Sequence, residues 1–199
     1  MRISFWKIVL VFALIAFGSL YAYNNSTTNS LVMTQQKSKH GIEGHHAPEL
    51  LTDIEWIDGK GNQMEAVQLS DYKGKFKVLY GFQSWCPGCH SRGLPALKNM
   101  VDALKDNDQI VFFAIQTVFE GAHTNTKDRL IETQKKYDLD IPFGHDVGNA
   151  KTLNRSSTMY NYRTGGTPWF IFIDQNDTVV FNDFHLDEDK AINFLKDIK

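Results

Sequence analysis

The residues best suited to chemistry are Cys86 and Cys89, the only two cysteines in the 199-residue chain. Their C-x-x-C spacing lets the two sulfurs close a small disulfide or share one metal ion. A structural zinc site needs two further ligands, and the chain has no second C-x-x-C. A permanent structural disulfide would contribute little, because so short a loop constrains little chain entropy. The pair therefore indicates thiol redox chemistry.

The elements on either side of the pair must position it. The apolar run 77–82 predicts a short buried strand before the cysteines. Apolar residues at three- and four-residue steps predict a helix after them, and these are Leu94, Leu97, Val101 and Leu104. Cys86 would begin that helix, where unpaired N–H groups and the helix dipole favour a thiolate. Cys89 would lie one turn further in, and we expect it to be the more shielded thiol.

Three stretches together resemble a known family. They are VLYGFQSWCPGC at 78–89, the later Gly166-Thr167-Pro168, and QLSDYKGK at 68–75. Their order and spacing are similar to the thioredoxin superfamily, most closely to its extracytoplasmic TlpA/ResA-like thiol-disulfide oxidoreductases with an AhpC/TSA-redoxin-like domain. The resemblance covers roughly Ala47 to Lys199. It implies a thioredoxin-like α/β fold with a central mixed sheet, flanking helices and an N-terminal β extension.

The resemblance also implies roles for individual residues. Cys86 would be the attacking thiol, Cys89 the resolving thiol, and Pro168 a cis-proline beside them. Supporting positions would be Trp85, Pro87, Gly88 and Thr167. The implied enzyme uses no cofactor and no metal, exchanges disulfides or dithiols with client proteins, and depends on an upstream redox partner. Pro87 is typical of oxidising members and the TlpA-like sequence of reducing ones, so the direction of electron flow stays open.

The chain departs from the family at three positions near the cysteines. Thioredoxins carry a buried acid six residues before the first cysteine, and here that residue is Tyr80. ResA-like proteins often have a glutamate three residues after the second cysteine, where this chain has Arg92. Arg92 would either favour the thiolate or be a solvated helix residue. His90 would either shuttle a proton or be an exposed helix histidine.

Two other functions compete with the disulfide-exchange hypothesis. A peroxiredoxin-like peroxidase is disfavoured because Gln83 stands where those enzymes usually have threonine, three residues before the reactive cysteine. A thioredoxin-fold copper chaperone would use both cysteines and a histidine as ligands. Such chaperones generally space their cysteines C-x-x-x-C.

The N-terminal region predicts export. Residues 1–23 begin with Arg2 and Lys7 and continue through an uncharged apolar run, which indicates a membrane anchor or a cleaved signal peptide. The basic start predicts that the domain lies outside the cytoplasm, on the periplasmic side. Residues 24–46 are polar and predict a flexible linker, followed by the thioredoxin-like domain at 47–199.

The remaining composition sets limits on structure and partners. With 42% hydrophobic and 13% aromatic residues, the chain can build a substantial core. A net charge of −2 without a basic cluster excludes nucleic acid as an expected partner. Further elements follow from the pattern: a hairpin from 54–57 to 66–69, strands at 109–116, 169–174 and 179–182, and helices at 128–137, near 150–160, and after Asp187.

Overall fold

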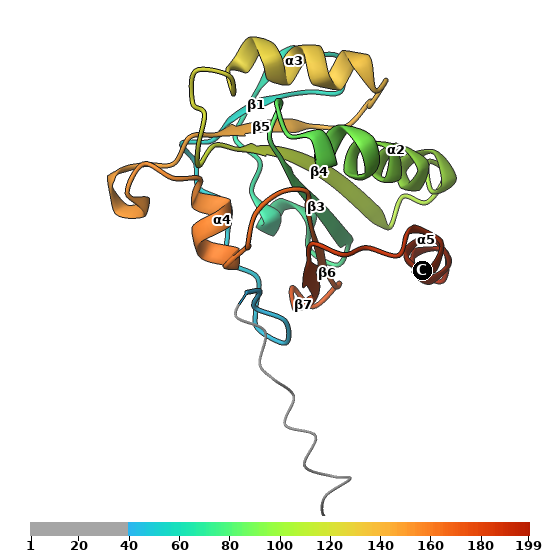
Figure 1. The fold of residues 1–199 in the computed structure, drawn as a ribbon. Coiled ribbons are helices and arrows are strands. Elements are labelled where there is room, and N and C mark those ends of the chain that lie inside the picture. The colour runs from blue at the N-terminus through green and yellow to red at the C-terminus, as the bar shows by residue number, and fades with distance from the viewer. Residues whose placement is uncertain (1–39) are drawn as a thin grey trace, which may run out of the picture. The chain divides into compact units, whose positions relative to one another are not determined.

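A seven-stranded mixed sheet runs through residues 40–199, the part of the chain that the computed structural model describes (Figure 1). Its strand order is β2-β1-β5-β4-β3-β6-β7. The strands are β1 (Glu55–Ile57), β2 (Gln63–Met64), β3 (Phe76–Phe82), β4 (Ile110–Thr117), β5 (Phe143–Asp146), β6 (Trp169–Ile173) and β7 (Val179–Asp183). The helical elements are η1 (Leu69–Tyr72), η2 (Cys89–Gly93), α2 (Leu94–Ala103), α3 (Lys127–Lys136), η3 (Ala150–Thr152), α4 (Ser157–Tyr162) and α5 (Glu188–Lys196).

The strand directions are those of a thioredoxin-like fold. β3 and β4 are parallel and joined through α2, and β4 and β5 are parallel and joined through α3. β6 pairs antiparallel with β3, and β7 pairs antiparallel with β6. The predicted α/β class, the parallel pair around the first helix and the antiparallel final hairpin are therefore confirmed.

Both faces of the central strand are buried, which explains its continuous apolar sequence. Because side chains alternate along a strand, Val78, Tyr80 and Phe82 join the core layer that contains residues of α2 and α5. Leu79 points the other way, into a second layer that contains Tyr162 of α4. The C-terminal end of this strand delivers the chain directly to the two cysteines.

The N-terminal hairpin forms, but its second strand differs from the prediction. β1 pairs with Gln63–Met64 instead of 66–69. Asp58 explains the early return, because its carboxylate accepts hydrogen bonds from the N–H groups of Lys60 and Asn62, both at 2.9 Å, and closes a tight turn. Leu69 instead begins η1, where the Glu49 carboxylate accepts its N–H at 2.5 Å.

The compact unit begins earlier than predicted, at His40. The linker was expected to extend to residue 46, but Gly44 N–H donates to Val179 O at 2.8 Å and Val179 N–H donates to His45 O at 2.9 Å. Residues near 44 therefore pair along β7, which corrects the predicted domain boundary at 47. The predicted anchor or signal segment at 1–23 lies outside the described residues. Among residues 40–199, no helix has the length and apolar character needed to cross a bilayer.

Candidate active site

The two cysteines lie where β3 gives way to a helix. Cys86 N–H donates to Gln83 O at 3.1 Å and closes the turn after the strand. Helical structure starts at Pro87 and continues through η2 into α2. Proline suits the first helical position, because its missing N–H would have no helical partner there. Cys86 therefore precedes the first turn of the helix, as the sequence predicted.

At this position, the sulfur of Cys86 accepts a hydrogen bond from an N–H group of the first helical turn. Cys89 N–H donates to Cys86 Sγ at 3.2 Å, and the Cys86 thiol donates to Thr167 O at 3.6 Å. An N–H donor at a helix N-terminus stabilises negative charge on the atom it faces. The geometry therefore suits a thiolate at Cys86.

Cys89 has a different environment. It is 0% exposed, whereas Cys86 keeps 7% of its surface in solvent, and both thiols are free. Burial, followed by the hydrogen bond with Cys86, raises the pKa of Cys89 to about 12. The Gln83 backbone and the Thr167 side chain oppose this shift. Cys89 therefore keeps its proton at neutral pH, and the expected inequality in shielding between the two thiols is present.

The loop at Gly166–Pro168, called the proline loop below, packs against this turn. The Thr167–Pro168 peptide bond is cis, in agreement with what the resemblance implied. Pro168 packs against the first helical turns, since a Cβ added to Gly88 would lie 3.4 Å from Pro168 Cδ. A Cβ added to Gly93 would approach Pro168 Cβ to 2.7 Å, which is too close. Glycine at 93 therefore allows the helix and the proline loop to meet.

Trp85, the residue before Cys86, is 45% exposed. Its indole lies beside the loop that follows β4, because a Cβ added to Gly121 would come within 3.1 Å of Trp85 Nε1. Trp85 is therefore a large, partly exposed side chain directly beside Cys86.

Hydrogen bonds from distant elements fix the turn, and sequence reasoning missed them. Asn125, which is 2% exposed, accepts the Ser84 N–H at 2.9 Å through its side-chain oxygen. His90 Nε2 donates to Ser84 O at 2.7 Å, and His90 Nδ1 lies 2.9 Å from the Tyr137 hydroxyl. No sequence signal joins Asn125 or Tyr137 to the cysteines, because each lies more than 30 residues downstream.

These contacts contradict the expectation that His90 is an exposed helix histidine. Its ring is half-buried and both nitrogens are engaged, so it fastens the turn instead of lying free on the helix surface. The same bonds leave no ring nitrogen for copper. No cluster of three potential metal ligands occurs within residues 40–199. Arg92 is exposed on η2.

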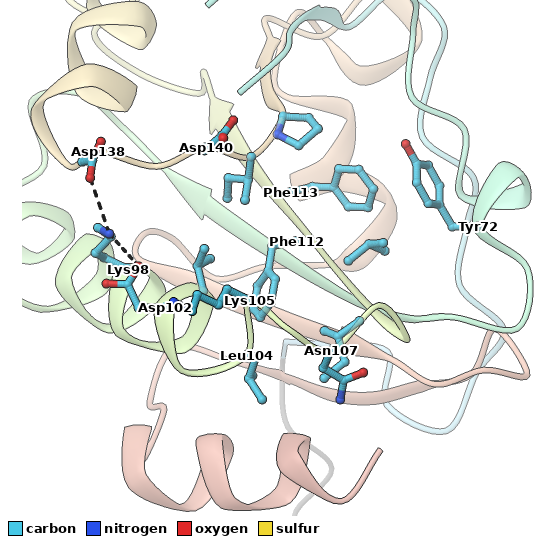
Figure 2. Close-up of a pocket in the computed structure, with 15 residues that line it drawn as sticks. Tyr72, Lys98, Asp102, Leu104, Lys105, Asn107, Phe112, Phe113, Asp138 and Asp140 are labelled. Atoms are coloured by element: carbon cyan, nitrogen blue, oxygen red, sulfur yellow. Dashed lines mark hydrogen bonds and ion pairs between the residues drawn. The ribbon is translucent and has the colours of Figure 1, made fainter. Parts of the chain in front are cut away.

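One hollow lies away from the cysteines. It measures about 620 Å³, and Figure 2 shows Lys98, Asp102 and Asp138 at its rim. Lys98 Nζ lies 2.6 Å from Asp102 Oδ1 and 3.8 Å from Asp138 Oδ2. The hollow borders the first residues of β4, whereas the cysteines follow the last residue of the parallel strand β3. It therefore lies at the opposite end of the sheet from the chemistry.

A smaller hollow of about 110 Å³ is lined by Arg92 and Gly93 of η2 and by Pro168. Its lining is mainly apolar, with Arg92 and His185 as the basic members. It is small for a drug-sized ligand, since such sites usually measure several hundred Å³.

Comparison with known proteins identifies the family of the chain. The model of the AhpC/TSA family matches residues 44–182, a range that contains both cysteines and the cis-proline. The chain belongs to the AhpC/TSA family. No curated protein matches the sequence significantly.

Solved structures agree with this membership. A thioredoxin-like superfamily protein is 26% identical, with a TM-score of 0.65 over 77% of this chain and 95% of its own. A thiol-disulfide isomerase from Corynebacterium glutamicum is 27% identical, with a TM-score of 0.63 over 76% of this chain and 96% of its own. A 2-Cys peroxiredoxin from Plasmodium vivax, 19% identical with a TM-score of 0.56 over 77% and 96%, shares the fold. The predicted thioredoxin-superfamily resemblance is confirmed, and this chain is consistent with an oxidoreductase.

Proposed function

We propose that this member of the AhpC/TSA family is a thiol-disulfide oxidoreductase that exchanges disulfides with client proteins through Cys86 and Cys89. The observation that carries the proposal is the 3.2 Å hydrogen bond from Cys89 N–H to Cys86 Sγ, combined with complete burial of Cys89. Cys86 is the more exposed of the two sulfurs, and it faces an N–H donor of the first helical turn. Cys89 is fully buried and would act second, as the resolving thiol.

The proposed reaction has two steps. The Cys86 thiolate attacks one sulfur of a client disulfide, forms a mixed disulfide and releases the client's other sulfur as a thiolate. Cys89 then attacks Cys86 Sγ, so the internal disulfide forms and the client leaves with both sulfurs reduced. An upstream dithiol partner would regenerate the enzyme. Oxidation of a client dithiol runs through the same steps in reverse.

Client recognition would use the surface around Cys86. The Thr167 carbonyl oxygen lies 3.6 Å from Cys86 Sγ, so an extended client segment could pair with the backbone at Thr167 while its sulfur reaches Cys86. The exposed Trp85 ring would pack on the same segment. We further propose that residues 1–23 hold the domain at the membrane on the extracytoplasmic side, on the basis of their basic start and apolar run.

Two single substitutions test the proposed roles. Cys86→Ser should abolish disulfide reduction in an insulin-turbidity assay, because no attacking thiol remains. Cys89→Ser should instead accumulate a covalent complex with the client, visible on a non-reducing gel and lost on adding dithiothreitol. Full activity in Cys86→Ser would overturn the assignment.

A peroxidase assay on the same variants addresses the competing function. A peroxidase would consume hydrogen peroxide through Cys86 and leave a sulfenic acid that dimedone labels. The proposed exchange enzyme should reduce insulin much faster than it reduces peroxide. The reverse order of rates would favour the peroxiredoxin-like alternative.

A further inference from the structure

Tyr80 of β3 carries a buried hydroxyl that the mechanism above does not use. The side chain is 0% exposed, and no atom of the described chain meets hydrogen-bond geometry with its oxygen. Unpaired buried donors are rare because they lose their bonds to water without replacement. Aromatic neighbours fix the ring, with centroid distances of 4.7 Å to Phe170 and 5.9 Å to Phe82. The hydroxyl therefore has a set position and calls for an explanation.

That position is beneath the turn that carries Cys89. A Cβ added to Gly93 would overlap the Tyr80 oxygen, and Gly93 closes the η2 turn that begins at Cys89. Burial raises the pKa of Tyr80 well above its usual value, and the Cys89 thiol is the next cause, through its charge and through a side-chain contact at hydrogen-bonding range that falls short of good hydrogen-bond geometry. The phenol therefore keeps its proton and lies close to the sulfur of Cys89.

Cys89 needs a hydrogen-bond donor at one moment of the reaction. As a neutral buried thiol it is stable, but it must lose its proton to attack the mixed disulfide, and a thiolate in an apolar interior is costly. No carboxylate from the described chain lies among the groups that shift its pKa. A donor that is idle before ionisation and bonded after it lowers the barrier without stabilising the ground state.

We propose that Tyr80 is this donor: its hydroxyl, unpaired beside the neutral Cys89 thiol, hydrogen-bonds the Cys89 sulfur as that sulfur becomes a thiolate and attacks. The inference rests on the proposed function. The Cys89 proton passes through solvent to the departing client thiolate, and Tyr80 keeps its own. The bond between Cys86 and Cys89 forms as the bond between Cys86 and the client breaks, so the two cysteines lose the two electrons that the client gains.

Stopped-flow reaction of the reduced full-length protein with 5,5′-dithiobis(2-nitrobenzoate) separates the two steps. Attack by Cys86 releases the first coloured thiolate, and resolution by Cys89 releases the second. Tyr80→Phe should leave the first phase unchanged and slow the second about ten- to a hundredfold, the factor expected for one hydrogen bond to a charged group. The ratio of second-phase rates should stay constant across the neutral pH range, because Cys89 remains protonated throughout it.

Tyr162→Phe is the matched control, since it also removes a buried hydroxyl, but one that donates to Pro48 O at 2.6 Å. This control should lower the Tm and leave both phases normal. Tyr80→Phe should not lower the Tm of the reduced protein, because its hydroxyl makes no bond in that state.

A second phase of Tyr80→Phe within twofold of wild type, or failure of that variant to fold, overturns the role of Tyr80. A wild-type protein with no first phase overturns the proposed function itself.

Discussion

Single residues at this site differ through their surroundings. Both cysteines have the same side chain and lie within one helical turn, yet one faces a free N–H group and the other faces apolar side chains. The Cys89 pKa of about 12 is above the reference value of 9.0, and burial is its largest cause. A raised pKa of this kind has a consequence for stability as well as for reactivity.

The stability of the reduced protein should fall as the pH rises from about 9 towards 12. Over that interval the folded state keeps the Cys89 proton while the unfolded state has lost it, so raising the pH favours unfolding. The slope attributable to Cys89 is at most about 1.4 kcal/mol per pH unit. Denaturant titration of reduced wild type and of Cys89→Ser across this range should show the steeper fall in wild type. Equal slopes would contradict the buried thiol.

Among the site residues, those near the cysteines in sequence could be predicted and the distant ones could not. The C-x-x-C spacing and the following apolar periodicity were sufficient to place Cys86 before the helix. Pro168 required the family resemblance, because no periodicity links it to residue 86. The contact of Asn125 with the cysteine turn could not be predicted, because its hydrogen bond with Ser84 N–H depends on how the loop after β4 folds back. The role inferred for Tyr80 depends on a buried hydroxyl without a hydrogen-bond partner, and only the packed structure shows that the partner is missing.

At the level of elements, the helix start is shaped by close packing with the proline loop. The segment Cys89–Gly93 is a π-helical turn, in which Leu94 N–H donates to Cys89 O. Apolar periodicity predicted the helix but not this extra residue in the turn, because side-chain spacing alone does not distinguish α from π geometry over five residues. Two glycines border the turn and differ in how much space each has.

Gly93→Ala should destabilise the protein by about 1–3 kcal/mol, a magnitude typical of overpacking in a core. The new methyl group would overlap the Tyr80 hydroxyl and press on Pro168. Gly88→Ala is the matched control, because Gly88 has similar helical angles and its added Cβ would make an ordinary 3.4 Å contact. That control should be neutral or stabilising by up to about 1 kcal/mol through helix propensity. Urea unfolding of both variants measures the difference, and equal losses would contradict this packing.

The second element that differed from expectation is the hairpin before β3. Sequence alternation favoured 66–69 as the returning strand because Val67 and Leu69 are apolar, and both are buried. Leu69 begins η1 and Val67 precedes it, and both pack into the second core layer without pairing in the sheet. Burial could therefore be predicted at these positions while the backbone pairing could not, since the Asp58 turn fixes the register independently of apolar pattern.

At the scale of the whole molecule, the fold was the most predictable property. Alternating strands and helices dictate a parallel core, and the final hairpin adds antiparallel strands at one edge. The N-terminal limit was predicted less well, because residues 40–46 are polar and resemble the linker before them. These residues belong to the domain because their backbone forms hydrogen bonds with β7, and amino-acid composition does not predict such bonds.

Residues 40–47 should therefore contribute measurably to stability. A chain that starts at His40 retains the bonds of Gly44 and His45 with Val179 and the 2.7 Å bond from Ala47 N–H to Asp177 O. A chain that starts at Pro48 loses these three backbone bonds and a fourth, from Gly41 N–H to Arg163 O at 2.9 Å. The four are together worth about 4 kcal/mol at about 1 kcal/mol each. The Tm of the shorter chain should be lower by roughly 8–16 °C for a domain of this size.

Differential scanning calorimetry of the two truncated chains measures this difference directly. The loss should appear in both the reduced and the oxidised states, because the pairing along β7 does not involve the cysteines. It should also leave the rate of the first thiol reaction unchanged when both chains are folded, since Cys86 depends on β3, η2 and the proline loop. If both chains unfold at the same temperature, residues 40–46 belong to the linker after all, and the domain begins at residue 47 as the composition first indicated.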